Sequence, residues 1–194
     1  MKRLFSLLAF AIVATLTFAA CGSDNASSSS SDGGEKFNDA DVTFAQSMIP
    51  HHQQAVEMAK MAQMHASTPE VKELADQIEA AQGPEIATMT DWLKAWGEDV
   101  PTGSGDMGGM DHDMGSGDMP GMMSEDDMKK LDAATGAEFD RMFLTMMSDH
   151  HAGAIEMAKT EQSDGQNPDA VALAKKIETD QAAELAQMKD LLKS

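Results

Sequence analysis

Two short segments of the chain combine paired histidine with methionine. The first reads MIPHHQQAVEMAK at residues 48–60, and the second reads MMSDHHAGAIEMAK at residues 146–159. Imidazole nitrogen binds copper in either oxidation state as well as zinc, and thioether sulfur is a soft ligand that selects Cu(I). These residue types point to a metal site, and their repetition indicates that the site is built twice or shared.

Adjacent histidines cannot both point at one spot from a helix, because each residue turns the direction by about 100°. Met48 lies one turn before both His51 and His52. The corresponding residues of the second segment are Met147, His150 and His151. If the two segments face each other as helices, they form one shared site or two related sites at their interface.

A third group of metal-binding side chains lies between these segments, in the stretch 97–124. Glycine, aspartate and proline argue against packed structure there, yet the stretch is rich in methionine. The candidate ligands are Met107, Met110, His112 and Met114. Outside the cytoplasm a thioether cannot be lost to a disulfide, and zinc sites more often contain cysteine or several acids. The linker is therefore typical of a flexible copper-gathering segment.

The elements that must position the paired histidines are helices. Apolar residues recur at spacings of three and four, and the segment 41–94 matches 140–193 at a constant offset of 99 residues. Capping residues, with proline following two of them, mark the starts. The pattern predicts helices near 38–66, 69–96, 125–163 and 168–193. Pro50 and Gly83-Pro84 fall inside the first two, where proline should kink a helix.

Four amphipathic helices in two hairpins predict an all-α fold, a four-helix bundle built from two duplicated helical hairpins. The first hairpin spans 37–96 and the second 125–194, and the Met/His/Gly-rich linker 97–124 joins them.

The N-terminus predicts export. Lys2 and Arg3 precede an apolar run, so residues 1–20 are expected to be a signal peptide. The residues before Cys21 resemble a bacterial lipoprotein cleavage box, which would make Cys21 the lipidated first residue of a flexible, serine-rich tether over 21–36. We expect an extracytoplasmic lipoprotein of the cell membrane, attached through its lipid only, or otherwise a secreted protein.

The amino-acid composition limits the kinds of partner that the protein is expected to bind. A net charge of -19 disfavours nucleic acid and anionic lipid and favours cations. Methionine occurs 18 times and outnumbers leucine, which is unusual for a soluble domain. The sequence contains no sign of a nucleophile triad or a phosphate-binding loop, and no catalytic residue is predicted.

The units HHQQAVEMAK and HHAGAIEMAK, with EIATMTDWL and ELAQMKDLL near the hairpin ends, resemble the bacterial family called domain of unknown function 305. The resemblance covers nearly all of 37–193, apart from the linker. It implies a ferritin-like four-helix fold, an extracytoplasmic location and, in some members, copper binding through histidine and methionine. Carried onto this sequence, the implied ligands are Met48, His51, His52, Met58, Met147, His150, His151 and Met157.

The favoured function is a copper-binding protein, a buffer, scavenger or chaperone for Cu(I) or Cu(II), with an unidentified copper-transfer protein as a partner. One alternative is a copper-dependent redox enzyme. Another is a helical interaction or stress module with structural histidines, against which the methionine-rich linker argues. A dinuclear iron oxidase is disfavoured because the chain contains no Glu-x-x-His. If histidines are ligands, protons should weaken copper binding as pH falls through about 6.5.

Overall fold

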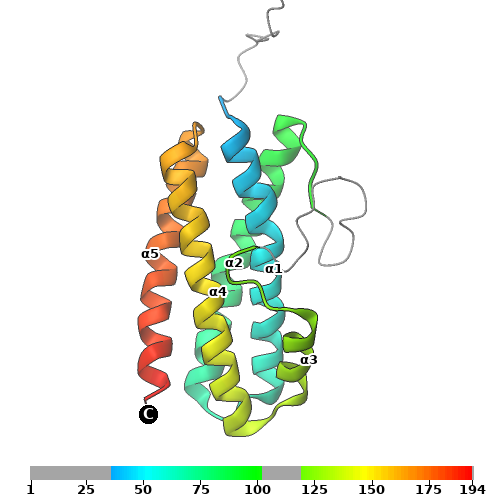
Figure 1. The fold of residues 1–194 in the computed structure, drawn as a ribbon, viewed down its shortest axis with the longest axis vertical. Coiled ribbons are helices and arrows are strands. Elements are labelled where there is room, and N and C mark those ends of the chain that lie inside the picture. Colours follow the sequence, from blue (N-terminus) through cyan, green and yellow to red (C-terminus); the bar gives the residue numbers. More distant parts are fainter. Residues whose placement is uncertain (1–35, 102–118, 194) are drawn as a thin grey trace, which may run out of the picture. The chain divides into compact units, whose positions relative to one another are not determined.

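The computed structural model describes residues 36–101 and 119–193, and within them the chain is all-helical (Figure 1). The helices are α1 (Asp39–His65), α2 (Pro69–Trp96), α3 (Glu125–Ala133), α4 (Gly136–Asp164) and α5 (Pro168–Leu191). They fall within one compact unit, Glu35–Ser194. The predicted all-α class is confirmed. The predicted signal peptide, Cys21 and most of the tether and linker lie outside the described residues.

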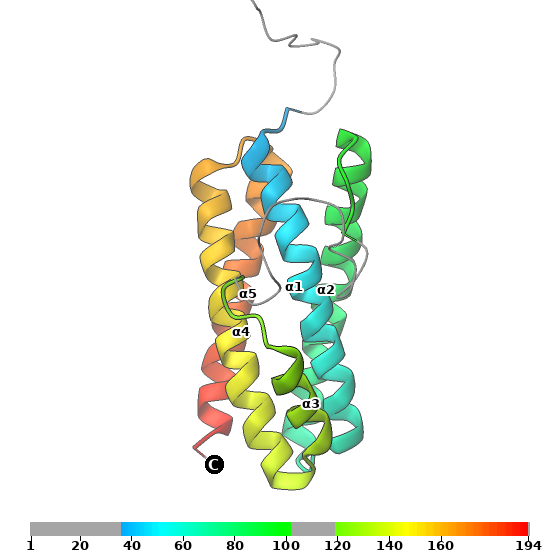
Figure 2. The same cartoon turned by 45° about the vertical axis from the view of Figure 1, so that its right-hand side comes forward.

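Two helical hairpins pack together to form the predicted four-helix bundle. α1 pairs with α2 and α4 pairs with α5, and the hairpins meet mainly along α1 and α4. These two helices run in opposite directions, as the colour order shows in Figures 1 and 2. The short α3 packs against α1 and α4. Among the described helices, none is long and apolar enough to cross a membrane.

The helices begin where the sequence provides caps. Asn38 accepts hydrogen bonds from the N–H groups of Ala40 and Asp41, and the Asp41 side chain accepts one from the Asn38 N–H at 2.7 Å. This reciprocal arrangement satisfies backbone groups that a helix start leaves free. Pro69 and Pro168 each occupy the first helical position, where the missing N–H of proline would have no helical partner anyway.

The structure corrects the predicted helix 125–163, which is two helices. The chain is extended at Ala134, with ψ of 154°, and at Thr135, and the next helix begins at Gly136. Gly136 has φ of +66°, a conformation that glycine adopts without a steric clash. By contrast, α1 and α2 continue unbroken through Pro50 and Pro84.

A layer of polar side chains divides the apolar core into two clusters. On each long helix, polar residues stand between positions that pack in one cluster and positions that pack in the other. The Phe44 cluster includes Phe44, Met48, Met89, Leu93, Ala158 and Ile177. The Phe139 cluster includes Met58, Leu74, Ile78, Phe139, Phe143 and Met147. The polar layer comprises His51, His52, Gln82, Glu85, His150, His151, Gln181 and the half-buried Glu184.

Each hairpin stabilises the turn of the other through one aspartate. Asp140 of α4 accepts hydrogen bonds from the N–H groups of residues 67–68, at 2.9 and 3.1 Å, and from the Ser67 hydroxyl at 2.6 Å. Asp41 of α1, which is 99 residues earlier, accepts from the N–H groups of residues 166–167. The two halves of the bundle therefore exchange equivalent polar contacts at their turns.

Replacing Asp140 with alanine is expected to destabilise the protein by about 3 kcal/mol, because two N–H groups and a hydroxyl lose a charged acceptor. For a domain of this size that corresponds to a fall in Tm of about 10 °C, measurable by circular dichroism. Glu57→Ala, at an exposed position of α1, is the matched control and should shift Tm by no more than about 2 °C. Equal Tm values for the two variants would contradict the capping role of Asp140.

Candidate metal centre

His51 of α1 and His150 of α4 face each other across the bundle. Their ring centroids lie 3.7 Å apart, and the ring planes are inclined by 39°. Both side chains are fully buried. The contact arises because α1 and α4 are the helices along which the hairpins meet.

His52 and His151 contact their own hairpin partners instead. His52 Nε2 lies 2.9 Å from the Glu85 carboxylate of α2, and His151 Nε2 lies 2.6 Å from the Glu184 carboxylate of α5. The two pairs are separated by the same offset of 99 residues, so each hairpin makes the same contact. The turn of about 100° between neighbouring residues explains why adjacent histidines have different partners.

The acceptors beside these rings fix their tautomers. A carboxylate or carbonyl oxygen only accepts, so His52 and His151 donate through Nε2, as does His51 to the Pro120 carbonyl at 3.1 Å. A neutral ring protonated at Nε2 carries a lone pair on Nδ1. The Nδ1 atoms of all four histidines, and also Nε2 of His150, are buried without a hydrogen-bond partner. Histidines that ligate metals usually show this arrangement, with the other nitrogen bonded to a carboxylate or carbonyl.

Burial favours the neutral form of His51, His52 and His150. Desolvation, and then the charge of His52, lower the pKa of His51 to about 3, and burial lowers the pKa of His150 well below its usual value. Burial also lowers the pKa of His52, although Glu85 opposes it. Burial alone would raise the pKa of Glu85, but hydrogen bonds from His52 and Lys176 outweigh it and lower that pKa. Copper binds neutral imidazole, so the onset of proton competition in the folded protein shifts below the predicted pH of about 6.5.

The methionines predicted as helical ligands lie on both sides of the histidines. Met48 packs in the Phe44 cluster, which the partly buried Met157 contacts. Met58 and Met147 pack in the Phe139 cluster. Of these four methionines, each side of the polar layer therefore receives one from α1 and one from α4. The structure does not gather the four sulfur atoms at one point, and Met48 and Met147 lie on opposite sides.

The remaining predicted ligands, Met107, Met110, His112 and Met114, lie outside the described residues. Within 36–101 and 119–193, no three His, Cys, Asp or Glu side chains form a group that could hold a metal ion. A metal bound by the imidazoles would therefore need further ligands, and Met48 and Met147 each lie one helical turn before a facing histidine. A set of imidazole and thioether donors fits copper better than zinc.

A pocket of about 350 Å³ opens between α1 and α4, and none of the four histidines lines it. Its walls include Ser47, Met157 and Glu161. Burial, followed by the neighbouring Asp41 carboxyl, raises the pKa of Glu161 to about 8. The raised pKa disfavours the charged carboxylate of Glu161, so the pocket is a poorer metal site than the histidine layer.

Sequence reasoning assigned no role to the polar residues that α2 and α5 contribute to the layer. Glu85 and Glu184 orient histidines, while Gln82 and Gln181 are buried with all their amide atoms unpartnered. Both pairs occur at the offset of 99 residues. The signal that identifies them is a polar residue at a core-facing position of an otherwise apolar stripe.

The fold and its central histidine layer define an all-helical bundle formed by two hairpins of the same plan. The chain belongs to the family described as domain of unknown function (DUF305), which matches residues 41–192. The family resemblance seen in the sequence is therefore confirmed.

Solved structures share this fold. A DUF305 protein from Streptomyces coelicolor, provisionally described as secreted, is 33% identical, with a TM-score of 0.68, and the match covers 79% of this chain and 91% of that one. CopM in the Cu(II)-bound form is 33% identical, with a TM-score of 0.65, and the match covers 79% of this chain and 95% of that one. A DUF305 fragment from Deinococcus radiodurans is 26% identical, with a TM-score of 0.69, and the match covers 80% and 96%. CopM is also known in Cu(I)-bound and silver-bound forms. No curated protein matches the sequence.

Proposed function

We propose that the protein binds copper outside the cytoplasm, as a buffer, scavenger or chaperone, with its tightest site at the histidine layer. The observation that carries this proposal is the set of buried imidazole nitrogens without partners, flanked by thioether groups on both sides. Such nitrogens cost free energy unless a ligand uses them. Similarity to CopM, which has been solved with Cu(I) and with Cu(II), supports copper as that ligand.

The histidines, methionines and glutamates of the bundle have different roles in copper binding. His51 and His150 supply imidazole nitrogens from opposite hairpins, and methionine supplies soft sulfur on either side. Glu85 and Glu184 hold His52 and His151 in the tautomer that leaves Nδ1 free. Imidazole accepts both oxidation states of copper, and thioether favours Cu(I), so the set suits a protein that takes up either ion.

The linker and the N-terminus have proposed roles in copper binding and membrane attachment outside the bundle. Met107, Met110, His112 and Met114 add copper-binding capacity. The glycine-rich composition of the linker implies an entropy cost for ordering it around a metal, so these ligands bind more weakly than side chains fixed by helix packing. Cys21 carries the lipid that keeps the protein at the membrane, and bound copper passes to a transfer protein that is still to be identified.

Metal titration of residues 22–194 tests the proposal. We expect copper to bind more tightly than zinc or iron, and deletion of 103–118 to lower the number of bound Cu(I) ions while the tightest component remains. The deletion stops before Pro120 so that its contact with His51 is kept. Displacement of copper by zinc at comparable concentrations would contradict copper as the ligand. Loss of the tightest component with the linker would move the main site out of the helices.

A further inference from the structure

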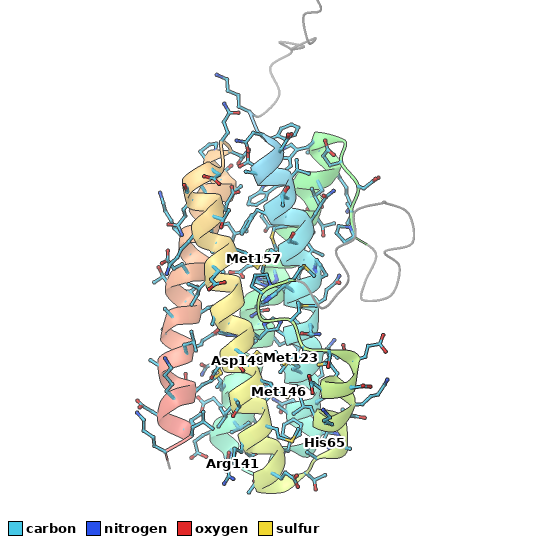
Figure 3. The ribbon with its side chains drawn as sticks, viewed as in Figure 1. His65, Met123, Arg141, Met146, Asp149 and Met157 are labelled. Carbon is cyan, nitrogen blue, oxygen red and sulfur yellow. The ribbon has the colours of Figure 1, made fainter. Side chains whose placement is uncertain are left out.

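The segment 119–124, here called the strap, passes over the His51–His150 pair. It leads to the N-cap of α3, and in Figures 1 and 2 it crosses the face formed by α1 and α4. Figure 3 shows Met123, near its end, on the face that also carries Met146 and Asp149 of α4.

The strap approaches α4 so closely that glycine is needed on both sides. A Cβ atom at Gly121 would lie 2.6 Å from the Asp149 carbonyl oxygen and 2.9 Å from that of His150. A Cβ atom at Gly153 would overlap the Pro120 backbone. Gly121 also has φ of +78°, which other residues rarely adopt. The contact is therefore specified by the sequence of both segments.

Gln54 fastens the strap to α1. Its amide nitrogen donates to the Met123 carbonyl at 2.9 Å, and its amide oxygen accepts from the Met123 N–H at 2.7 Å. The residue 99 positions later is Gly153, which makes room for the strap on α4. Corresponding positions of the two hairpins therefore carry different residues. Gln54 binds the strap on α1, and Gly153 leaves space for it on α4.

The strap also distinguishes the two facing histidines. The Pro120 carbonyl accepts the Nε2 hydrogen of His51, whereas neither ring nitrogen of His150 has a hydrogen-bond partner. A ligand histidine is oriented by the hydrogen bond of its other nitrogen. The strap therefore holds His51 with Nδ1 free for a ligand.

Copper can reach His51 and His150 only if part of their cover moves, because both side chains are fully buried. The long helices contribute many residues to the two apolar clusters, whereas the strap packs Met123 against the Phe139 cluster and is otherwise held by Gln54, His51 and glycine contacts. Segments with few apolar contacts open more readily than packed helices. We propose that the strap is a movable cover that orients His51 and limits the rate at which copper reaches and leaves the histidine pair. This inference rests on the proposed function, since it assumes copper at these residues.

Gln54→Ala tests the inference, because it removes both hydrogen bonds to Met123 and keeps a residue that favours helix. Residues 22–194 are loaded with Cu(I), and transfer to excess bicinchoninate is followed by stopped flow, with uptake measured in the reverse direction. The histidine component is the one that is missing from a His51→Ala/His150→Ala variant. We expect Gln54→Ala to speed its uptake and release by about tenfold each, and to change its Kd by less than about threefold.

Gln46→Ala is the matched control. Gln46 is also a glutamine of α1, and its amide nitrogen donates at 2.9 Å to the carbonyl of Asp99, at the other end of the linker. This control should leave both rates unchanged. Gly153→Ala displaces the strap from the α4 side and should speed the same component. In nitrogen NMR spectra, the His51 ring should carry its hydrogen on Nε2 in the wild type and populate both tautomers in Gln54→Ala.

Unchanged rates in both Gln54→Ala and Gly153→Ala would overturn the inference. So would a weaker Kd with an unchanged uptake rate, since that result makes the strap part of the site and not its cover. The absence of any histidine component in the wild type would instead overturn the proposed function, and the inference with it.

Discussion

Replacing His51 and His150 together by alanine is expected to weaken the tightest copper binding by at least about 100-fold. The variant removes the two rings that face each other across α1 and α4, together with their unpartnered nitrogens. Loss of a group that only orients a ligand commonly weakens metal binding by about 10- to 100-fold, so the loss of two ligands should exceed that range. Competition against a Cu(I) chelator of known affinity measures the effect.

The matched control is His65→Ala. His65 lies on the same helix and contacts Phe139 and Asp132, outside the polar layer. Its replacement should leave the tightest component unchanged. Thermal unfolding of the metal-free double variant shows that it is folded at the temperature of the titration. Tight binding that persists in the double variant would make the two histidines structural.

Acid is expected to destabilise the metal-free protein, with the loss beginning near pH 6.5. His51 stays neutral in the folded state down to about pH 3, while in the unfolded chain it takes up a proton near its ordinary pKa of 6.5. At this ring protons therefore bind preferentially to the unfolded state, so its contribution to stability is full above pH 6.5 and falls as pH drops towards the folded pKa. Between pH 6.5 and 5 this amounts to about 2 kcal/mol for His51 alone. His150 and His52 act in the same direction, since burial also lowers their pKa values, and together the three histidines outweigh Glu161, whose raised pKa opposes them.

Urea unfolding at a series of pH values measures this dependence. His51→Gln should reduce the slope of the unfolding free energy against pH by about one proton in this range. Phe143→Leu is a suitable control, because it lowers stability through the apolar core without removing a titrating group, and should leave the slope unchanged. A slope that His51→Gln does not alter would show that burial leaves this ring free to protonate in the folded state.

The helices and the paired histidines were predictable because their signals are local. Apolar spacing and proline after a capping residue located α1, α2 and α5 closely. The break before α4 was missed, because the residues around Ala134 keep a helical pattern and Gly136 alone does not end one. The direction of the histidines followed from helix geometry, and His51 of α1 contacts His150 of α4 at the interface of the two hairpins.

The surroundings of the histidines were not predictable, because they depend on how the elements pack. Glu85 is 33 residues from His52, and their contact exists only because α2 folds back on α1 at one register. The strap has no periodic pattern, and its contact with His51 is made by a backbone carbonyl, which carries no signal in the amino-acid type. The tautomers, and hence the free nitrogens, follow from these neighbours.

The exchange of capping aspartates has a consequence for the origin of the chain. Asp41 serves the turn after α4, and Asp140 serves the turn after α1, so neither hairpin contains the acid that its own turn requires. In this interpretation, a single ancestral hairpin was complete only as a symmetric homodimer, in which each subunit lent its aspartate to the other. In this interpretation, once two copies were fused, equivalent positions in the two halves no longer had to carry the same residue. Gln54 and Gly153 are, on the same interpretation, equivalent positions that no longer need to match, and the strap meets α1 at one and α4 at the other.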